Sequence, residues 1–175
     1  MVSRRELKTE HEDVVLRQFK EYISSKVMNL ELLERPEPPD AIIELDGQRT
    51  WVEITDAFLD KEHAISLTTG ACEDVEHLPD DRRLIIDPDA SFSRVLHSVI
   101  EFKYAKAAMC KVAATEGLGI LLVGIFTPFT MAEEVARIEG SAVTEIIASK
   151  ARKIFESIYV YDGSGRREFH LLYRL

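Results

Sequence analysis

Residues 39–55 read PDAIIELDGQRTWVEIT and contain the clearest structural signal in the chain. Two runs of β-forming residues, 40–45 and 50–55, stand on either side of Asp46-Gly47. An Asp-Gly pair between such runs favours a two-residue turn, because both residues tolerate positive φ angles. The stretch therefore predicts a β-hairpin. The proline-rich run Pro36-Glu37-Pro38-Pro39 precedes it and predicts an extended chain entering the first strand.

Helices and strands alternate on either side of this hairpin. Residues 4–27 predict a helix, because apolar residues recur there at helical spacing. Further along we predict loop with some helix at 58–82, a short strand at 84–86, a long helix at 92–114, a strand at 120–126, helices at 131–139 and 143–156, and a second hairpin joining 157–161 to 168–173. The unbroken apolar run of 120–126 predicts burial on both faces. Such a mixture predicts an α/β fold, a mixed central sheet flanked by helices, in one domain spanning 1–175.

Composition and charge narrow the class of protein. The chain has 175 residues and a net charge of −9, which counts against a broad nucleic-acid-binding surface. Its basic clusters, Arg4-Arg5-Lys8, Arg82-Arg83 and Arg166-Arg167, are typical of solvated surface. The N-terminus is charged and no apolar run is long enough to span a membrane, which favours a protein with no membrane partner. The chain has only two cysteines, which favours a cytoplasmic location.

A glutamate inside the second strand of the hairpin is the first candidate for a metal-binding residue. Alternation along a strand places Trp51, Glu53 and Thr55 on one face. A carboxylate in the apolar setting Val-Glu-Ile is costly unless it is paired or binds a metal. Asp40 opens the partner strand, so a second carboxylate comes close, and a hard divalent cation such as Mg²⁺ would relieve the repulsion between the two. Such an ion can activate water for attack on a phosphoryl group.

These features together resemble the PD-(D/E)XK nuclease superfamily. The resemblance spans about residues 4–126 and consists of an N-terminal helix carrying a glutamate, Pro39-Asp40 at a strand start, the hairpin, and Glu53 in the next strand. It implies a restriction-endonuclease-like fold, Mg²⁺- or Mn²⁺-dependent cleavage of phosphodiester bonds, nucleic acid as substrate with DNA favoured over RNA, and often a homodimer. It also implies that Asp40 and Glu53 hold the metal and that the main-chain carbonyl of Ile54 completes the site.

The chain departs from the family at the motif lysine, which is Thr55 here. A helical wheel over 92–114 places Lys103 in the middle of the apolar face, and some family members resemble this arrangement, with the catalytic lysine moved to the helix after the hairpin. The alternative is that Lys103 extends along its stem to the surface. Lys61 is a weaker substitute.

A third carboxylate is Glu12, which lies on the apolar stripe of its helix and matches the glutamate of the family's first helix. The alternative is an acid that stabilises the first turns of that helix. The five histidines show no metal-ligand spacing, so we expect them to have structural or surface roles. We expect Asp56 to pair with a lysine or to cap a turn.

Three functional hypotheses stay open. The intact Pro39-Asp40 and the apolar surroundings of Glu53 favour an active metal-dependent nuclease. The missing motif lysine and the net charge of −9 favour a catalytically inactive relative that binds nucleic acid or a protein partner. A domain of similar topology with no metal is the third. Under the first hypothesis, the amine of Lys103 reaches the carboxylate site.

Overall fold

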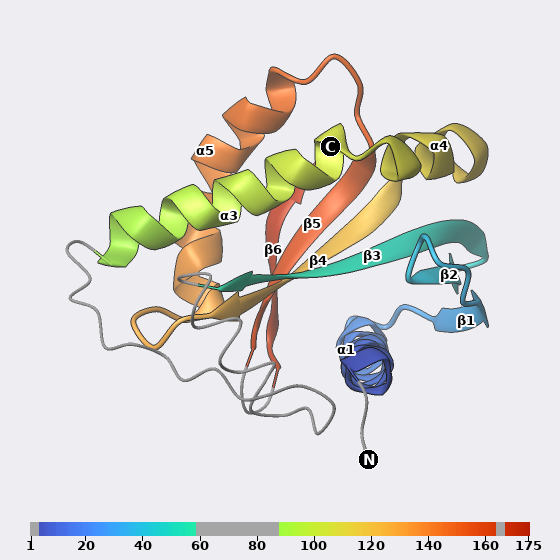
Figure 1. The fold of residues 1–175 in the computed structure, drawn as a ribbon. Coiled ribbons are helices and arrows are strands. Elements are labelled where there is room, and N and C mark those ends of the chain that lie inside the picture. The colour runs from blue at the N-terminus through green and yellow to red at the C-terminus, as the bar shows by residue number, and fades with distance from the viewer. Residues whose placement is uncertain (1–3, 59–87, 164–166) are drawn as a thin grey trace.

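The computed structural model describes residues 4–58, 88–163 and 167–175, which form a six-stranded mixed sheet between two layers of helices (Figure 1). The strands lie in chain order: β1 (Leu30–Glu34), β2 (Ala41–Leu45), β3 (Gln48–Phe58), β4 (Gly119–Phe126), β5 (Phe155–Asp162) and β6 (Phe169–Arg174). The β3–β4 and β4–β5 pairs are parallel and the other pairs are antiparallel. Helix α1 (Arg4–Ser25) covers one face, and α3 (Pro88–Ala105), α4 (Ala107–Glu116) and α5 (Ala132–Ala148) cover the other. The predicted mixed sheet flanked by helices is confirmed.

The predicted hairpin is present and its register is fixed by its turn. Asp46 and Gly47 take φ angles of 48° and 79°, and the two residues that flank them pair directly. Both strands then run back to the pair Ala41–Val52, where β2 begins. Strand β3 continues to Phe58, and over this last part its only strand neighbour among the described residues is β4. Asp40 therefore stands where β2 gives way to an open edge of β3.

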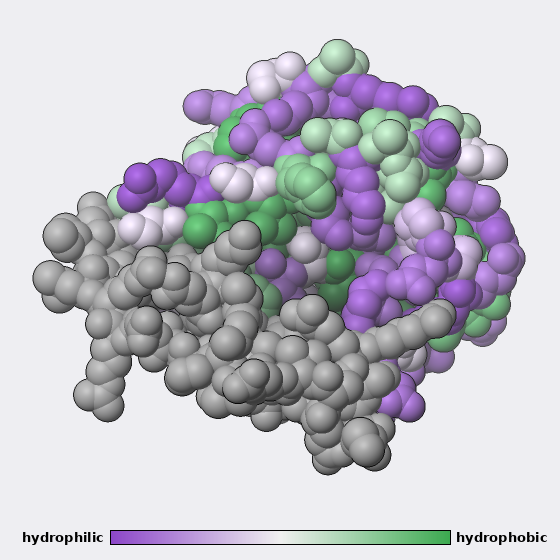
Figure 2. All heavy atoms as spheres, viewed as in Figure 1, coloured by the Kyte–Doolittle hydropathy of each residue, from purple (hydrophilic) through white to green (hydrophobic). Residues whose placement is uncertain are grey.

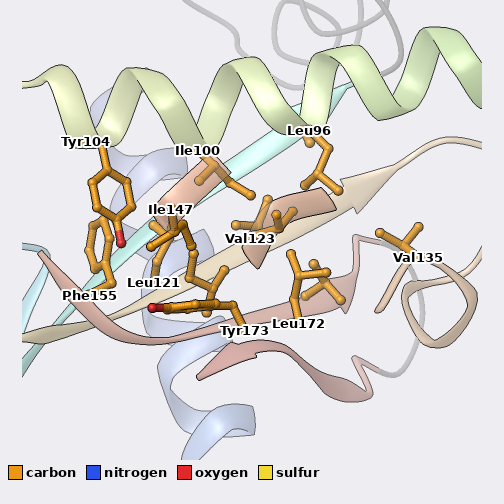
Figure 3. Packing of buried hydrophobic residues seen from close by; sticks show 14 of the residues in the cluster. Leu96, Ile100, Tyr104, Leu121, Val123, Val135, Ile147, Phe155, Leu172 and Tyr173 are labelled. Atoms are coloured by element: carbon orange, nitrogen blue, oxygen red, sulfur yellow. The ribbon is translucent and has the colours of Figure 1, made fainter. Parts of the chain in front are cut away.

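The core has two layers because β4 is buried on both faces, as its apolar run predicts. Leu121 and Val123 pack toward α3, where Leu96, Ile100 and Tyr104 point down onto the sheet (Figure 3). The alternate β4 residues Ile120 and Leu122 pack toward α1. The outer side of the upper helices is mostly hydrophilic, with hydrophobic residues in view below α3 (Figure 2). None of the described helices is long and apolar enough to span a membrane.

Three details of the predicted order are wrong. Strand β1 was not predicted, because it is a short edge strand with only its first residue buried and shows no alternation. The helix predicted at 92–114 is two helices, since the backbone of Lys106 is extended with ψ of 113°. The two helices predicted at 131–156 are one, α5, which runs through Ser141 and ends at Ala148.

Helix α5 continues through Gly140 and Ser141, so Ser141 lies inside the helix and does not begin one. Gly140 faces β6, where an added β-carbon would lie 3.4 Å from the carbonyl oxygen of Leu172, at ordinary van der Waals contact. The residues expected to extend the second helix instead form a connection and the start of β5. The strand predicted at 84–86 and the segment 59–82 lie outside the described residues.

Gly119 is a position in the described part of the chain that has no room for a side chain. An added β-carbon would overlap the indole ring of Trp51, which is fully buried and donates a hydrogen bond to the carbonyl of Gly117 at 2.8 Å. We expect Gly119→Ala to lower the free energy of unfolding by about 1–3 kcal/mol through overpacking, measured by urea denaturation. Gly140→Ala is the matched control, because it has room and gains helix propensity. Equal losses in the two variants would contradict this account.

Candidate functional site

Charge is concentrated in one buried region of the protein. Among the described residues, the buried polar or charged side chains are Glu12, Asp40, Glu53, Lys103 and Ser157. The first four are the residues that the sequence singled out as site residues. Because an isolated charge in an apolar interior is strongly unfavourable, such a group has to be balanced internally or by a ligand.

Glu53 lies at the centre of the site, in the middle of β3. Its side chain is 4% exposed and lies on the same face of β3 as Trp51, so it points toward α3. One carboxylate oxygen, Oε1, accepts a hydrogen bond from the amine of Lys103 at 2.6 Å. The other, Oε2, is buried and has no hydrogen-bond partner. An unpaired buried carboxylate oxygen carries the full cost of desolvation, and a cation would relieve that cost.

Two lysines approach Glu53 from the α3 layer. The amine of Lys103 lies against Oε1 and 3.5 Å from the carbonyl oxygen of Ile54. Lys106 stands at the break between α3 and α4, and its amine lies 3.7 Å from the same Oε1. The break redirects the chain so that both residues reach one oxygen. Lys103 is buried, whereas the side chain of Lys106 is 39% exposed.

Asp40 lies on the other side of Glu53, at the start of β2. Its Oδ2 accepts a hydrogen bond from the backbone N–H of Ile54 at 2.7 Å. Burial, and then the negative charge of Glu53, raise the pKa of Asp40 to about 6, against the smaller lowering effect of the Ile54 N–H. The two carboxylates are therefore close enough to repel each other.

Glu12 borders the site from the α1 side. Its carboxylate forms ion pairs with Lys8 at 3.3 Å and with Arg35 at 3.7 Å. The charge of Glu12 also raises the pKa of Asp40, so the two groups are near neighbours. Cations thus stand on both flanks of the carboxylates, Lys8 and Arg35 from one layer and the two lysines from the other.

The donors present suit a hard cation. Oδ1 of Asp40, Oε2 of Glu53 and the carbonyl of Ile54 are oxygen ligands of the kind Mg²⁺ takes, with water completing the shell. Within the described ranges, no three side chains of the His, Cys, Asp or Glu type are grouped to hold a metal. The ion would therefore depend on two carboxylates, and the orphaned Oε2 and the repulsion felt by Asp40 are the observations that fit it.

The remaining sequence predictions have different outcomes. Thr55 follows Ile54 on β3, half-buried and without a charge, as expected. Lys61 lies outside the described residues. The prediction that Asp56 pairs with a lysine or caps a turn is wrong, because its carboxylate contacts Tyr161 and His11. Sequence reasoning missed this contact, since the three residues are far apart in the chain and only the alternation of β3 places Asp56 on the α1 face.

Comparison with protein-family models, with curated proteins and with solved structures finds no match for this chain. The site itself combines two repelling carboxylates, a buried amine and exposed cations at an open strand edge. Such a set can bind a divalent cation and a phosphate ester together, because the cation and the lysines both attract anionic oxygens.

The pair formed by Lys103 and Glu53 gives a prediction about stability. Lys103→Met removes the buried counter-ion of the carboxylate and leaves only the more distant, half-exposed Lys106, so we expect a loss of about 3–5 kcal/mol in the free energy of unfolding. The double variant Lys103→Met, Glu53→Gln should recover a large part of that loss, because no uncompensated charge is left. Urea denaturation in EDTA measures both, and additive losses in the double variant would show that the two groups do not interact.

The raised pKa of Asp40 gives a prediction about pH. Between the ordinary value of 3.8 and the folded value of about 6, the folded protein keeps a proton that the unfolded chain releases. Stability contributed by this group is therefore lost as pH rises through that window, by about 3 kcal/mol in total. Asp40→Asn should remove this component, so the wild type minus variant difference, measured by urea unfolding in EDTA, should fall from pH 4 to pH 7. A difference independent of pH would contradict the assignment.

Proposed function

We propose that this protein is a Mg²⁺-dependent nuclease of the PD-(D/E)XK type, with a restriction-endonuclease-like fold, that cleaves phosphodiester bonds in nucleic acid. The observation that carries the proposal is the unpaired, buried Oε2 of Glu53 beside the repelled carboxylate of Asp40. A protein without a cation at this position would retain two adjacent buried acids at a cost to its stability. The resemblance of the hairpin and its Pro39-Asp40 to that superfamily supports the same reaction.

Each residue has a role that follows from its position. Asp40 and Glu53, with the carbonyl of Ile54, would hold Mg²⁺ or Mn²⁺. When bound, the ion would supply an activated water and stabilise charge on the phosphoryl group. Lys103 fixes the orientation of Glu53 by its 2.6 Å hydrogen bond and provides the positive charge that Thr55 lacks. Lys103 is the displaced lysine of this proposal.

The surroundings of the carboxylates support an anionic substrate. Lys8 and Arg35 stand on the α1 flank and Lys106 on the α3 flank, so cations border the site although the chain as a whole carries −9. Local field rather than net charge governs the approach of a phosphate. DNA in preference to RNA, a cytoplasmic location and a homodimer belong to the same proposal.

A second candidate function is a catalytically inactive nuclease-fold module that binds nucleic acid or a protein. One observation favours it: the amine of Lys103 already contacts Glu53 and lies 3.5 Å from the carbonyl of Ile54. That amine is itself a cation between two of the three groups assigned to the metal. If its charge suffices to balance the carboxylates, the site needs no ion.

The deciding experiment is Mg²⁺ and Mn²⁺ binding by calorimetry, with plasmid nicking assayed on the same samples. We expect the wild type to bind metal and nick DNA, and Glu53→Gln to lose both, because glutamine keeps the hydrogen bond from Lys103 but cannot balance a divalent ion. Glu101→Gln is the control, since Glu101 is an exposed carboxylate in a surface ion pair with Lys150.

The outcomes separate the two candidates. Metal binding that depends on Glu53, together with nicking, supports the nuclease. A wild type that binds no metal at millimolar concentration and does not nick overturns it in favour of the inactive module. Nicking that persists in Glu53→Gln would place the activity elsewhere. Circular dichroism of each variant shows whether the fold is retained.

A further inference from the structure

A second polar cluster lies on the α1 side of the sheet and has no part in the proposed metal site. His11 from α1, Asp56 from β3 and Tyr161 from β5 converge there. The hydroxyl of Tyr161 donates to Oδ1 of Asp56 at 3.0 Å, and Nε2 of His11 lies 3.3 Å from Oδ2 of the same carboxylate and 3.4 Å from the Tyr161 hydroxyl. Three elements thus bring an acid, an imidazole and a phenol together.

The backbone of the parallel strands creates the space for this cluster. Asp56 and Tyr161 are both paired with Gly124 of β4, which lies between them. A β-carbon at Gly124 would overlap the carboxylate and would come 2.9 Å from the Tyr161 hydroxyl. The cluster lies toward the carboxyl ends of three adjacent parallel strands, where open α/β sheets bind their ligands.

The hydrogen bonds of the cluster orient the imidazole. Burial, and then the negative charge of Asp56, raise the pKa of Tyr161 well above its usual range. The phenol therefore stays a neutral donor to Asp56. Nε2 of His11 lies 3.3 Å from the second oxygen of Asp56, in ion-pair contact with the carboxylate. Nδ1 is left without a hydrogen-bond partner among the described residues, on a side chain that is 26% exposed. A ring held by a carboxylate through one nitrogen and free at the other is arranged for proton transfer.

This ring lies on the opposite side of the sheet from Lys103, and its partner Tyr161 is near enough to Asp40 to feel that carboxylate's charge. Asp56 lies two residues beyond Ile54 on the same face, about 7 Å along the strand. Helix α1 also brings Glu12, the neighbour of His11, close enough to act on Asp40. A phosphodiester at Asp40 would then have the lysines on one side and His11 on the other. Displacement at phosphorus needs the attacking and leaving oxygens roughly in line, on opposite sides.

We propose, on the basis of the nuclease function above, that His11 is the general acid of the reaction and that Asp56 and Tyr161 position its ring. The oxygen of the attacking water, having given one proton to solvent, forms a new bond to phosphorus. The bond from phosphorus to the leaving oxygen breaks, and its electron pair stays on that oxygen. Nδ1–H of the protonated imidazole delivers a proton to the leaving oxygen, and the ring regains a proton from solvent.

The other role open to the cluster is structural, in which it only ties α1 to the sheet. His11→Gln separates the two roles, because the glutamine amide can keep a contact with Asp56 in place of Nε2 but is far too weak an acid to protonate a leaving oxygen. His97→Gln is the matched control. His97 is 25% exposed and its Nε2 also lies near a carboxylate, that of Glu139 at 2.9 Å, but on the α3 side of the sheet.

The experiment compares two DNA oligonucleotides of one sequence. One has ordinary linkages, and the other has bridging sulfur in place of the leaving oxygen, made as 3′-S and 5′-S versions. A thiolate leaves without protonation, so it needs no general acid. We expect His11→Gln to lower kcat/KM about 100-fold or more on the ordinary oligonucleotide and to leave cleavage of the sulfur-containing substrate at the wild-type rate. His97→Gln should leave both rates unchanged.

Equal losses on both substrates, or no loss on either, would overturn the general-acid assignment, and a lower melting temperature accompanying equal losses would identify the structural role. The proposed function fails separately. If the wild type cleaves nothing, or Glu53→Gln cleaves as the wild type does, the nuclease itself is wrong and this inference falls with it. If Glu53→Gln is inactive and His11→Gln is fully active, the inference about His11 alone is wrong.

Discussion

The buried ion pair between Glu53 and Lys103 joins the centre of the sheet to the helix layer above it. Glu53 lies inside the sheet and Lys103 near the end of the helix that crosses it, so the pair fixes how α3 packs on β3. Only one oxygen of Glu53 is satisfied by this contact. Oε2 is one of the buried polar atoms left without a hydrogen-bond partner among the described residues, and it lies beside a second acid. This imbalance of charge is the reason for proposing a site here.

The sheet separates the α1 layer from the α3 layer, except at the edge of β3 that β2 leaves unpaired. Pro36-Glu37-Pro38-Pro39 cannot continue the ladder, so β2 begins only at Ala41 and β3 runs on without it. Groups from the α1 layer, such as Glu12 and Arg35, and groups from the α3 layer, such as Lys103, therefore meet around Asp40. A longer β2 would have separated the two layers. The position of the prolines is thus as important to the site as its charged residues are.

Much of the site could be predicted, because a charge among apolar neighbours is conspicuous in a sequence. Glu53 within Val-Glu-Ile and Lys103 on an apolar helix face both proved buried, and alternation gave the correct face of Glu53. The turn at Asp46-Gly47 fixed the register. The break at Lys106 has no proline or glycine to mark it, and the edge strand β1 has no alternation to reveal it. The contact of His11 with Tyr161 spans 150 positions, and no local pattern encodes it.

The strand order has a consequence for synthesis. Strands pair in the order in which they leave the ribosome, so the hairpin with Asp40 and Glu53 can form early. Its counter-ion, Lys103, belongs to a helix made later. Until that helix docks, the nascent hairpin carries two acids whose charges no lysine of α3 balances, and burying them is costly. We therefore expect the hairpin to become fully buried only when α3 packs on it and supplies Lys103.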